Sequence, residues 1–503
     1  MPVRRPIARR RTSYWPTAFG IRCRIAAGTE RRSSRTVLMV FVGVQLGMIL
    51  STLDGTIVAT ALPTIGRDLG NESARSWIIT GYLLAQVATM PIYGKIGDLY
   101  GRKRVFLFSL GLFTVGSVLC GAAQTLGQLV AFRCVQGLGS GGLGVLAMAI
   151  VADVVPARSL GRWLGYQGAL FAIASLVGPL TGGVFVDHLS WRWAFYVNLP
   201  IAAASAFIVF DKLHVPYRRV AHAIDYVGAV LLTVSLTAVV VAASIGGREV
   251  RWTSVEIVGL FVIAAVSAGL LVMRERSASE PVLPLRMFAA PVVRIASLIN
   301  VTSGALFASG IYFLPVFLQQ VAGVSATKSG LLLIPFMFTT AFTTLVAGRR
   351  VEASGRYRVW PIIGSALAVV GTGLLATLSR DTSVWVAAGF GAVLGSGMGF
   401  IMQTSLLALQ NGVDQRDLGV ATSTALLSRM LGVTLGAAVL SAVYQDRVGA
   451  TSSIAAVARA IPAVYLAGLP VAVATVVLAL RLPEHALRDH TGFDPAIVDG
   501  GRE

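Results

Sequence analysis

The sequence has little charge for its length. Only 13% of its 503 residues are Asp, Glu, Lys or Arg, whereas soluble domains are about a quarter charged. The rest is strongly apolar, with 55% hydrophobic residues and a mean hydropathy of +0.74. This balance excludes a soluble globular protein and indicates an integral membrane protein.

Cysteine and histidine are also scarce. The three cysteines, Cys23, Cys120 and Cys134, show no paired spacing, which argues against disulfides and thiolate metal sites. All five histidines fall in connections or in the C-terminal tail. The chain has no G-x-x-x-x-G-K-S/T phosphate loop and no connection long enough for a nucleotide-binding domain. We expect neither a metal nor any other cofactor.

Long apolar runs dominate the sequence. They have about 20 residues each, the length that crosses a ~30 Å hydrocarbon core as a helix. We predict an all-α membrane protein with fourteen transmembrane helices, because a β-barrel would show alternating segments of ~10 residues instead. The predicted spans are 37–62, 77–97, 105–123, 127–151, 163–186, 193–210, 224–245, 254–273, 292–318, 329–347, 360–378, 384–408, 418–444 and 460–481.

The net charge of +19 is explained better by membrane topology than by binding to nucleic acid. Positive residues concentrate in alternate connections, for example at 102–104, 158–162 and 349–358. By the positive-inside rule these connections are cytoplasmic, as are the basic N-terminal tail, 1–36, and the C-terminal tail, 482–503. The N-terminal tail is either a contact for anionic lipid or simply a topology signal.

A short charged loop occurs twice, as GKIGDLYGRKR from Gly94 and as GRRVEASGRYR from Gly348. Both copies follow an even-numbered span, the second and the tenth, so the repeat is parallel. Two parallel six-helix halves fit this pattern, and the offset of eight spans leaves two extra helices between them. The predicted divisions are an N-terminal half at 37–210, an inserted pair with its loops at 211–291 and a C-terminal half at 292–481.

Several motifs carry a resemblance to a known family. They are GKIGDLYGRKR; LDGTIVATALP from Leu53 to Pro63, with Ala59 where asparagine is usual; Arg133 with Gln136, Gly137 and Gly139 in span four; the glycines and proline of span five; WRWAFYVNLP at 191–200; and LGVATSTALLSRMLGVTLGAA at 418–438. Over roughly residues 37–481 the chain resembles the fourteen-helix drug:proton antiporter branch of the major facilitator superfamily. The resemblance implies the major facilitator fold.

The repeated loop has the residues of a conformational latch. Gly94 permits close helix approach, Gly101 permits a tight reversal, and Asp98 lies at the membrane boundary. The resemblance implies that span thirteen begins nearby, and an anion is stabilised at a helix N-terminus. The predicted latch also includes Arg102, Lys103 and Arg104, with Glu352, Gly355 and Arg356 as a less faithful second copy. Positive-inside anchoring alone is the alternative interpretation.

Asp54 is the one acid clearly inside a predicted span of the first half. A carboxylate there is costly unless it is paired or protonated, so it is a functional candidate. At 1.5 Å per residue, Asp54 and Arg133 lie about 12 and 9 Å from the outer ends of their spans. We therefore predict that they pair, and that protonation of Asp54 frees Arg133. A static buried ion pair is the alternative.

Span five carries a glycine and proline motif. Gly168, Gly178, Pro179, Gly182 and Gly183 resemble the motif associated with antiporters. Proline lacks an N–H group and crowds the preceding helical turn, while the glycines allow close helix packing. We predict a kinked, tightly packed span that limits leak between the halves.

Arg429 lies deep in span thirteen, where a charge is costly. Its candidate partners are backbone carbonyls, which rank first, Asp54 across a cavity, or a substrate anion. With Gln136, Tyr312 and Phe313 it is a candidate for lining the substrate cavity. Two deep arginines against one deep aspartate disfavour a dicationic substrate.

The sequence predicts a proton-driven exporter of hydrophobic small molecules such as drugs. A dedicated exporter of a native metabolite, lipid or siderophore is the alternative with the same fold. A membrane enzyme would need clustered His, Asp or Glu within the spans, and a scaffold would not need Asp54 or Arg133. Only four lysines beside many arginines indicate a GC-rich bacterial genome. We expect a bacterial plasma membrane, contact with its lipids and, from the resemblance, a monomer.

Overall fold

The computed structural model describes residues 34–69, 76–155, 157–213, 225–246, 250, 252–278, 284–414, 417–448 and 453–487. Most of the two predicted tails, at 1–33 and 488–503, lies outside the described residues.

Helices follow one another along the chain with short connections. The first eight are α2 (Ser34–Asp68), α3 (Ser76–Tyr100), α4 (Arg102–Ala122), α5 (Leu126–Val154), α6 (Ala157–His188), the short α7 (Trp193–Tyr196), α8 (Asn198–Lys212) and α9 (Tyr226–Ile245). The next five segments are α10 (Val255–Ser277), the 3-10 turn η1 (Leu285–Ala289), α11 (Pro291–Ala308), the π-helical η2 (Ser309–Phe313) and α12 (Leu314–Val316). The remaining segments are the π-helical η3 (Phe317–Val321), α13 (Ala326–Leu332), α14 (Ile334–Ser354), α15 (Val359–Leu375), α16 (Val384–Asn411), α17 (Leu418–Val448) and α18 (Ile454–Arg481).

Each predicted span coincides with helix, although three of them are divided. The span predicted at 193–210 is α7 plus α8, the span at 292–318 runs from α11 through η3, and the span at 329–347 is divided between α13 and α14. Among the described residues, ten helical stretches are long and apolar enough to cross a membrane, and two shorter apolar helices lie at Val227–Ala243 and Val359–Leu375. The structure supports an all-helical membrane fold, while the count of fourteen crossings and the predicted domain limits stay predictions.

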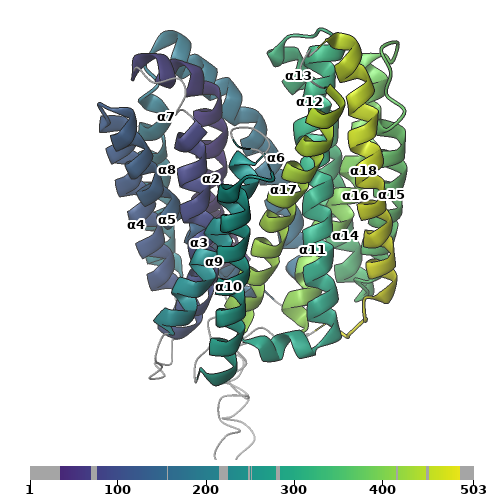
Figure 1. Cartoon of the computed structure of the whole chain (residues 1–503). Coiled ribbons are helices and arrows are strands. Elements are labelled where there is room, and N and C mark those ends of the chain that lie inside the picture. The colour runs from purple at the N-terminus through teal and green to yellow at the C-terminus, as the bar shows by residue number, and fades with distance from the viewer. Residues whose placement is uncertain are drawn as a thin grey trace, which may run out of the picture.

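The helices form two bundles side by side (Figure 1). Helices α2 to α8 make one bundle and α11 to α18 the other. The bundles meet where α3 packs on α17 and where α6 packs on α14. These two seams hold the charged loops and the cavity described below.

The pair α9 and α10 lies in front of the seam between α3 and α17 (Figure 1). Leu232 and Leu236 of α9 pack in one apolar cluster with Val87 of α3 and Leu427 of α17. Helix α9 therefore contacts both helices of this seam, α3 and α17. The base of the pair is held by Asp225, since Nε of Arg274 lies 3.1 Å from both of its carboxylate oxygens.

The two copies of the repeated loop each contain a glycine with a positive φ angle. Gly101, predicted to permit a tight reversal, has φ 90°, and Gly355, 254 residues further on, has φ 69°. Residues with a Cβ rarely adopt these angles, whereas glycine adopts them freely. Gly101 leads directly into α4, whereas three residues separate Gly355 from the start of α15 at Val359.

Candidate functional site

A buried ion pair lies inside the first bundle, between α2 and α5. Asp54 is 0% exposed and Arg133 is 1% exposed. Nη1 of Arg133 donates to Oδ2 of Asp54. The two side chains are therefore in contact, as the depth argument predicted, whereas their role in proton coupling stays a prediction.

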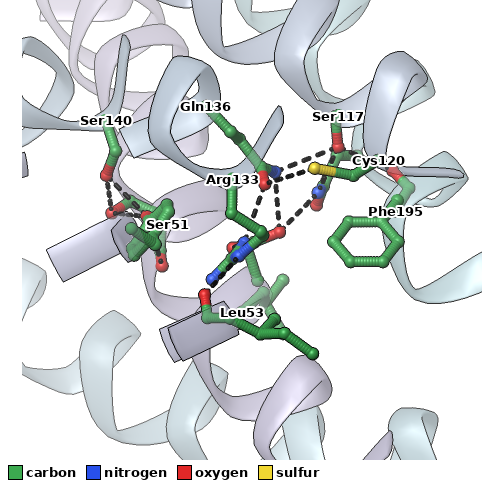
Figure 2. Close-up of polar contacts among 12 residues, drawn as sticks. Ser51, Leu53, Ser117, Cys120, Arg133, Gln136, Ser140 and Phe195 are labelled. Carbon is green, nitrogen blue, oxygen red and sulfur yellow. Dashed lines mark hydrogen bonds and ion pairs between the residues drawn. The ribbon is translucent and has the colours of Figure 1, made fainter. Parts of the chain in front are cut away.

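Amide side chains complete the surroundings of Asp54. Its Oδ1 accepts hydrogen bonds from Nε2 of Gln136 at 2.7 Å and from Nδ2 of Asn198 at 3.2 Å. Both amides also donate to the Ser117 hydroxyl, at 3.1 and 2.9 Å (Figure 2). Asn198 lies within the WRWAFYVNLP motif but was not predicted as a site residue. Four helices, α2, α4, α5 and α8, thus converge on one carboxylate.

Arg133 has a second set of partners besides Asp54. Its Nε donates to the carbonyl of Ile78 at 3.2 Å, and its Nη1 donates to Oε1 of Gln136 at 2.7 Å. The guanidinium carbon also lies 4.0 Å from the centre of the Tyr82 ring, a favourable cation–π geometry. These contacts can hold the guanidinium if Asp54 loses its charge.

A cluster of hydroxyl groups adjoins the ion pair through Tyr82. The Tyr82 hydroxyl lies 2.6 Å from Oγ of Ser140 and 3.1 Å from Oγ of Ser51. Nε2 of Gln86 donates to Ser140 at 2.8 Å and to Ser51 at 3.2 Å. Figure 2 shows Ser51 and Ser140 beside the Arg133 network. The polar groups therefore continue away from Asp54 within the same bundle.

The predicted latch residue Asp98 bridges the two bundles. Its two carboxylate oxygens accept the backbone N–H groups of Gly419 and Val420, each at 3.2 Å. These are first-turn amides of α17, which have no carbonyl partner within their own helix. Gly94 makes room for this contact, because a Cβ at that position would lie 2.7 Å from the carbonyl oxygen of Gly419.

Arg102 is the only member of the predicted basic trio, among the described contacts, that joins Asp98. Its Nη2 lies 2.6 Å from Oδ1 of Asp98, and its Nη1 lies 2.6 Å from Oδ2 of Asp153. Asp153, at the end of α5, was not predicted as a site residue. Nζ of Lys103 donates to the carbonyl of Phe210 at 2.7 Å, and Arg104 is exposed.

The second copy of the loop makes a different contact between the bundles. Oε1 of Glu352 lies 3.5 Å from Nη1 of Arg162 on α6, and both side chains are partly exposed. Gly165, 254 residues before Gly419, lies in the interior of α6, where backbone amides already bond within the helix. The position equivalent to the start of α17 is therefore not a helix N-terminus. Arg356 is exposed.

The predicted motif of span five faces two neighbours. A Cβ at Gly178 or Gly182 would overlap the hydroxyls of Thr56 and Thr60 on α2, whereas a Cβ at Gly183 would meet nothing within 4 Å. A Cβ at Gly168 would lie 3.1 Å from Cγ2 of Thr344 on α14. Helix α6 continues through Pro179, whose side chain lies outside the described part of the structure.

A cavity of about 290 Å³ lies between the two bundles. Six methionines contribute to its wall, three from each bundle, and Met148 and Met402 are 254 residues apart. The described lining residues are Met48, Met90, Met148, Gln167, Gly168, Phe307, Met337, Thr340, Ala341, Thr344, Met402, Gln403, Leu426, Arg429, Met430 and Val433.

Of the four residues predicted for the cavity, Arg429 is found among these lining residues. Gln136 is not among them; it lies one helical turn from Arg133 and donates to Asp54. Tyr312 and Phe313 are not among the described lining residues either. Tyr312 is 51% exposed, and Phe313 is buried against Tyr444. Both lie in the π-helical turn η2, where the usual 3.6-residue period does not hold.

Arg429 is held by neutral groups. Its Nη2 donates to the carbonyl of Met402 at 2.6 Å and to Oδ1 of Asn300 at 3.2 Å. Its buried Nε has no hydrogen-bond partner among the described residues. The carbonyl that ranked first among its expected partners is thus present, together with the amide of Asn300.

Comparison with known proteins gives consistent relatives. A family model described as Major Facilitator Superfamily matches residues 44–437. An uncharacterized MFS-type transporter of Mycobacterium tuberculosis (strain ATCC 25618 / H37Rv) is 38% identical over 406 residues, 81% of this chain and 59% of that protein. The chain thus spans less than two thirds of the length of that relative. Multidrug resistance protein 3 of Bacillus subtilis (strain 168) is 37% identical over 421 residues, 83% of this chain and 81% of that protein.

A solved structure has the same fold. The proton:xylose symporter XylE, bound to 6-bromo-6-deoxy-D-glucose, aligns with a TM-score of 0.65 over 91% of this chain and 98% of that one. The identity is 14%, so this likeness concerns the arrangement of helices alone.

Proposed function

The chain belongs to the major facilitator superfamily, and from this premise we propose that it exports hydrophobic small molecules by alternating access, in exchange for protons. The observation that carries the proposal is the fully buried carboxylate of Asp54. A carboxylate placed inside an apolar span is costly, and here it faces a cation and two amides that can respond to its charge.

Protonation of Asp54 would reverse the local hydrogen bonding. The three described partners of its carboxylate, Arg133, Gln136 and Asn198, all donate to it. A protonated carboxyl has an O–H donor of its own, so at least one of these donors would lose its acceptor. Arg133 could then rest on the Ile78 carbonyl and the Tyr82 ring. Proton binding would in this way favour a second arrangement of α2 and α5.

The proton site is proposed for the first bundle alone. The positions 254 residues after Asp54 and Arg133 are Ala308 and Ala387. One protonatable pair, and not two, would therefore drive the cycle.

The contacts between the bundles correspond to one state of that cycle. Asp98 on the amides of α17, and Arg162 beside Glu352, both lie at the end of the bundles where the repeated loops are. With these loops on the cytoplasmic side, this arrangement is closed toward the cytoplasm. We further place the protein in a bacterial plasma membrane as a monomer, with both termini cytoplasmic.

The proposal is tested with purified protein in lipid vesicles. An acid-inside pH gradient, imposed by dilution, should drive uptake of a fluorescent hydrophobic dye, and collapse of the gradient should stop it. Asp54→Asn should abolish the gradient-driven part, because the amide cannot exchange a proton. Asp381→Asn, on an exposed residue, is the matched control. Uptake by Asp54→Asn at the wild-type rate would overturn the assigned coupling.

A further inference from the structure

We propose that the central cavity selects apolar molecules that carry one negative charge or a strong hydrogen-bond acceptor. Arg429 is the residue that binds this charged or accepting group. This inference rests on the proposed function, since it names the substrate class of the same transporter.

The described residues that line the cavity carry positive charge but no negative charge. Its described lining residues include Arg429 and no aspartate or glutamate. The partners of Arg429, the Met402 carbonyl and the Asn300 amide, are both neutral. A cation that leaves water without a counter-charge is costly. An entering anion would supply the missing charge.

Arg429 also has bonding capacity left. Its Nε is buried and has no hydrogen-bond partner among the described residues. A guanidinium offers carboxylate, phenolate or sulfonate oxygens a pair of parallel donors, which is the strongest of its hydrogen-bonding arrangements. Arg429 is one of the residues that line the cavity, so a ligand in the cavity lies beside its side chain.

Arg133, the other arginine deep within a span, differs from Arg429 because its charge is already balanced by Asp54. Neither Arg133 nor Asp54 appears among the described lining residues of the cavity. The carboxylate of Asp54 is therefore not available to an entering cation, and a cationic ligand would meet the like charge of Arg429.

The remainder of the wall fits an apolar body with a few polar substituents. Methionine side chains are flexible and polarisable, and they adapt to differently shaped ligands. The amides of Gln167 and Gln403 each have a carbonyl oxygen without a partner among the described residues, which can accept a ligand hydroxyl. A volume of about 290 Å³ lies at the small end of ligand pockets, so the ligand is a single compact molecule.

The test is equilibrium binding of two dyes that share one ring system. Fluorescein is an anionic xanthene and rhodamine 123 a cationic one. Each is titrated by fluorescence anisotropy against the full-length protein in nanodiscs, with empty nanodiscs subtracted. Wild type should bind fluorescein at least roughly tenfold more tightly, the factor that one charge-assisted hydrogen bond supplies.

Substitutions then assign the preference to Arg429. Arg429→Gln should weaken fluorescein binding by at least about tenfold and should not weaken rhodamine 123 binding, because the substitution removes a like charge. Arg459→Gln, the same change at an exposed position of α18, should alter neither. Arg429→Lys keeps the charge and should retain the anion preference if Arg429→Gln does not fold. Tighter or equal binding of rhodamine 123 by wild type, or unchanged fluorescein binding by a folded Arg429→Gln, would overturn the inference.

The outcome separates this inference from the proposed function. Preferential fluorescein binding without gradient-driven transport would support the anion site and refute the proton-driven export. Gradient-driven transport without anion preference would support proton-driven export and refute the anion site. Many protonophores are themselves apolar weak acids and hence candidate ligands, so the transport arm uses an imposed pH gradient instead.

Discussion

Replacing Asp98 by asparagine removes a charge that joins α3 to the start of α17. The carboxylate accepts the amides of Gly419 and Val420 at 3.2 Å each and also faces Arg102. Asparagine has one acceptor oxygen and one donor group, so at least one of the two bonds between the bundles is lost. Arg102 keeps its second partner, Asp153, and the fold should survive.

The size of the effect follows from the two bonds. A hydrogen bond to a charged group contributes about 1.5–3 kcal/mol and a neutral one about 0.5–1.5 kcal/mol. If asparagine keeps one neutral bond in place of two charged ones, the closed state loses about 1.5–5.5 kcal/mol. At 1.4 kcal/mol per factor of ten, the ratio of closed to open molecules falls by roughly 10- to 10,000-fold.

Distances between spin labels report this ratio. Labels at Arg104 and Arg350, both exposed and in opposite bundles at the loop end, should show one short distance in wild type and a dominant longer one in Asp98→Asn. Serine replaces Cys23 and Cys134, and Asp381→Asn is the control variant. Transport by Asp98→Asn should fall, because one state of the cycle is depleted. Distance distributions identical to wild type, together with full transport, would refute the latch.

Three further predictions follow from the contacts. Gly419→Ala should open the same end, since its Cβ would lie 2.5 Å from Oδ1 of Asp98, whereas Gly111→Ala, which meets nothing within 4 Å, should leave the label distances unchanged. Glu352→Gln should reduce transport by less than about fivefold, because partly exposed ion pairs contribute about 1 kcal/mol or less; a total loss would contradict this. Asn198→Ala should slow gradient-driven transport, because the Asp54 carboxylate loses one of its three described hydrogen-bond donors. Transport at the wild-type rate would argue against a role for Asn198.

Much of the fold and part of the site could be predicted from the sequence. Apolar runs give helix positions because a helix must cross a fixed thickness. The repeat places the glycine turns, and the depth argument brings Asp54 to Arg133. These predictions depend on spacing along the chain, which a sequence states directly.

The surroundings of some residues could not be predicted, because they depend on how each helix is rotated about its axis and on how the helices pack. Asn198 is the first residue of α8, directly after the interruption that separates α8 from α7. Apolar content does not reveal such an interruption. Tyr312 and Phe313 turn away from the cavity because each π-helical turn adds a residue to the helical repeat. Gln136 could have been placed from its spacing of three from Arg133, since residues three apart share a helix face.

The methionine wall has a consequence for cells under oxidative attack. Six of the eleven methionines in the chain line the cavity. Oxidation of a thioether to a sulfoxide replaces an apolar surface by a strongly polar one, and methionine sulfoxide reductases reverse the change. Peroxide or hypochlorite entering the cavity would thus blunt recognition of apolar cargo while leaving the Asp54 carboxylate chemically intact. Export capacity would then depend on how fast the cell repairs sulfoxides.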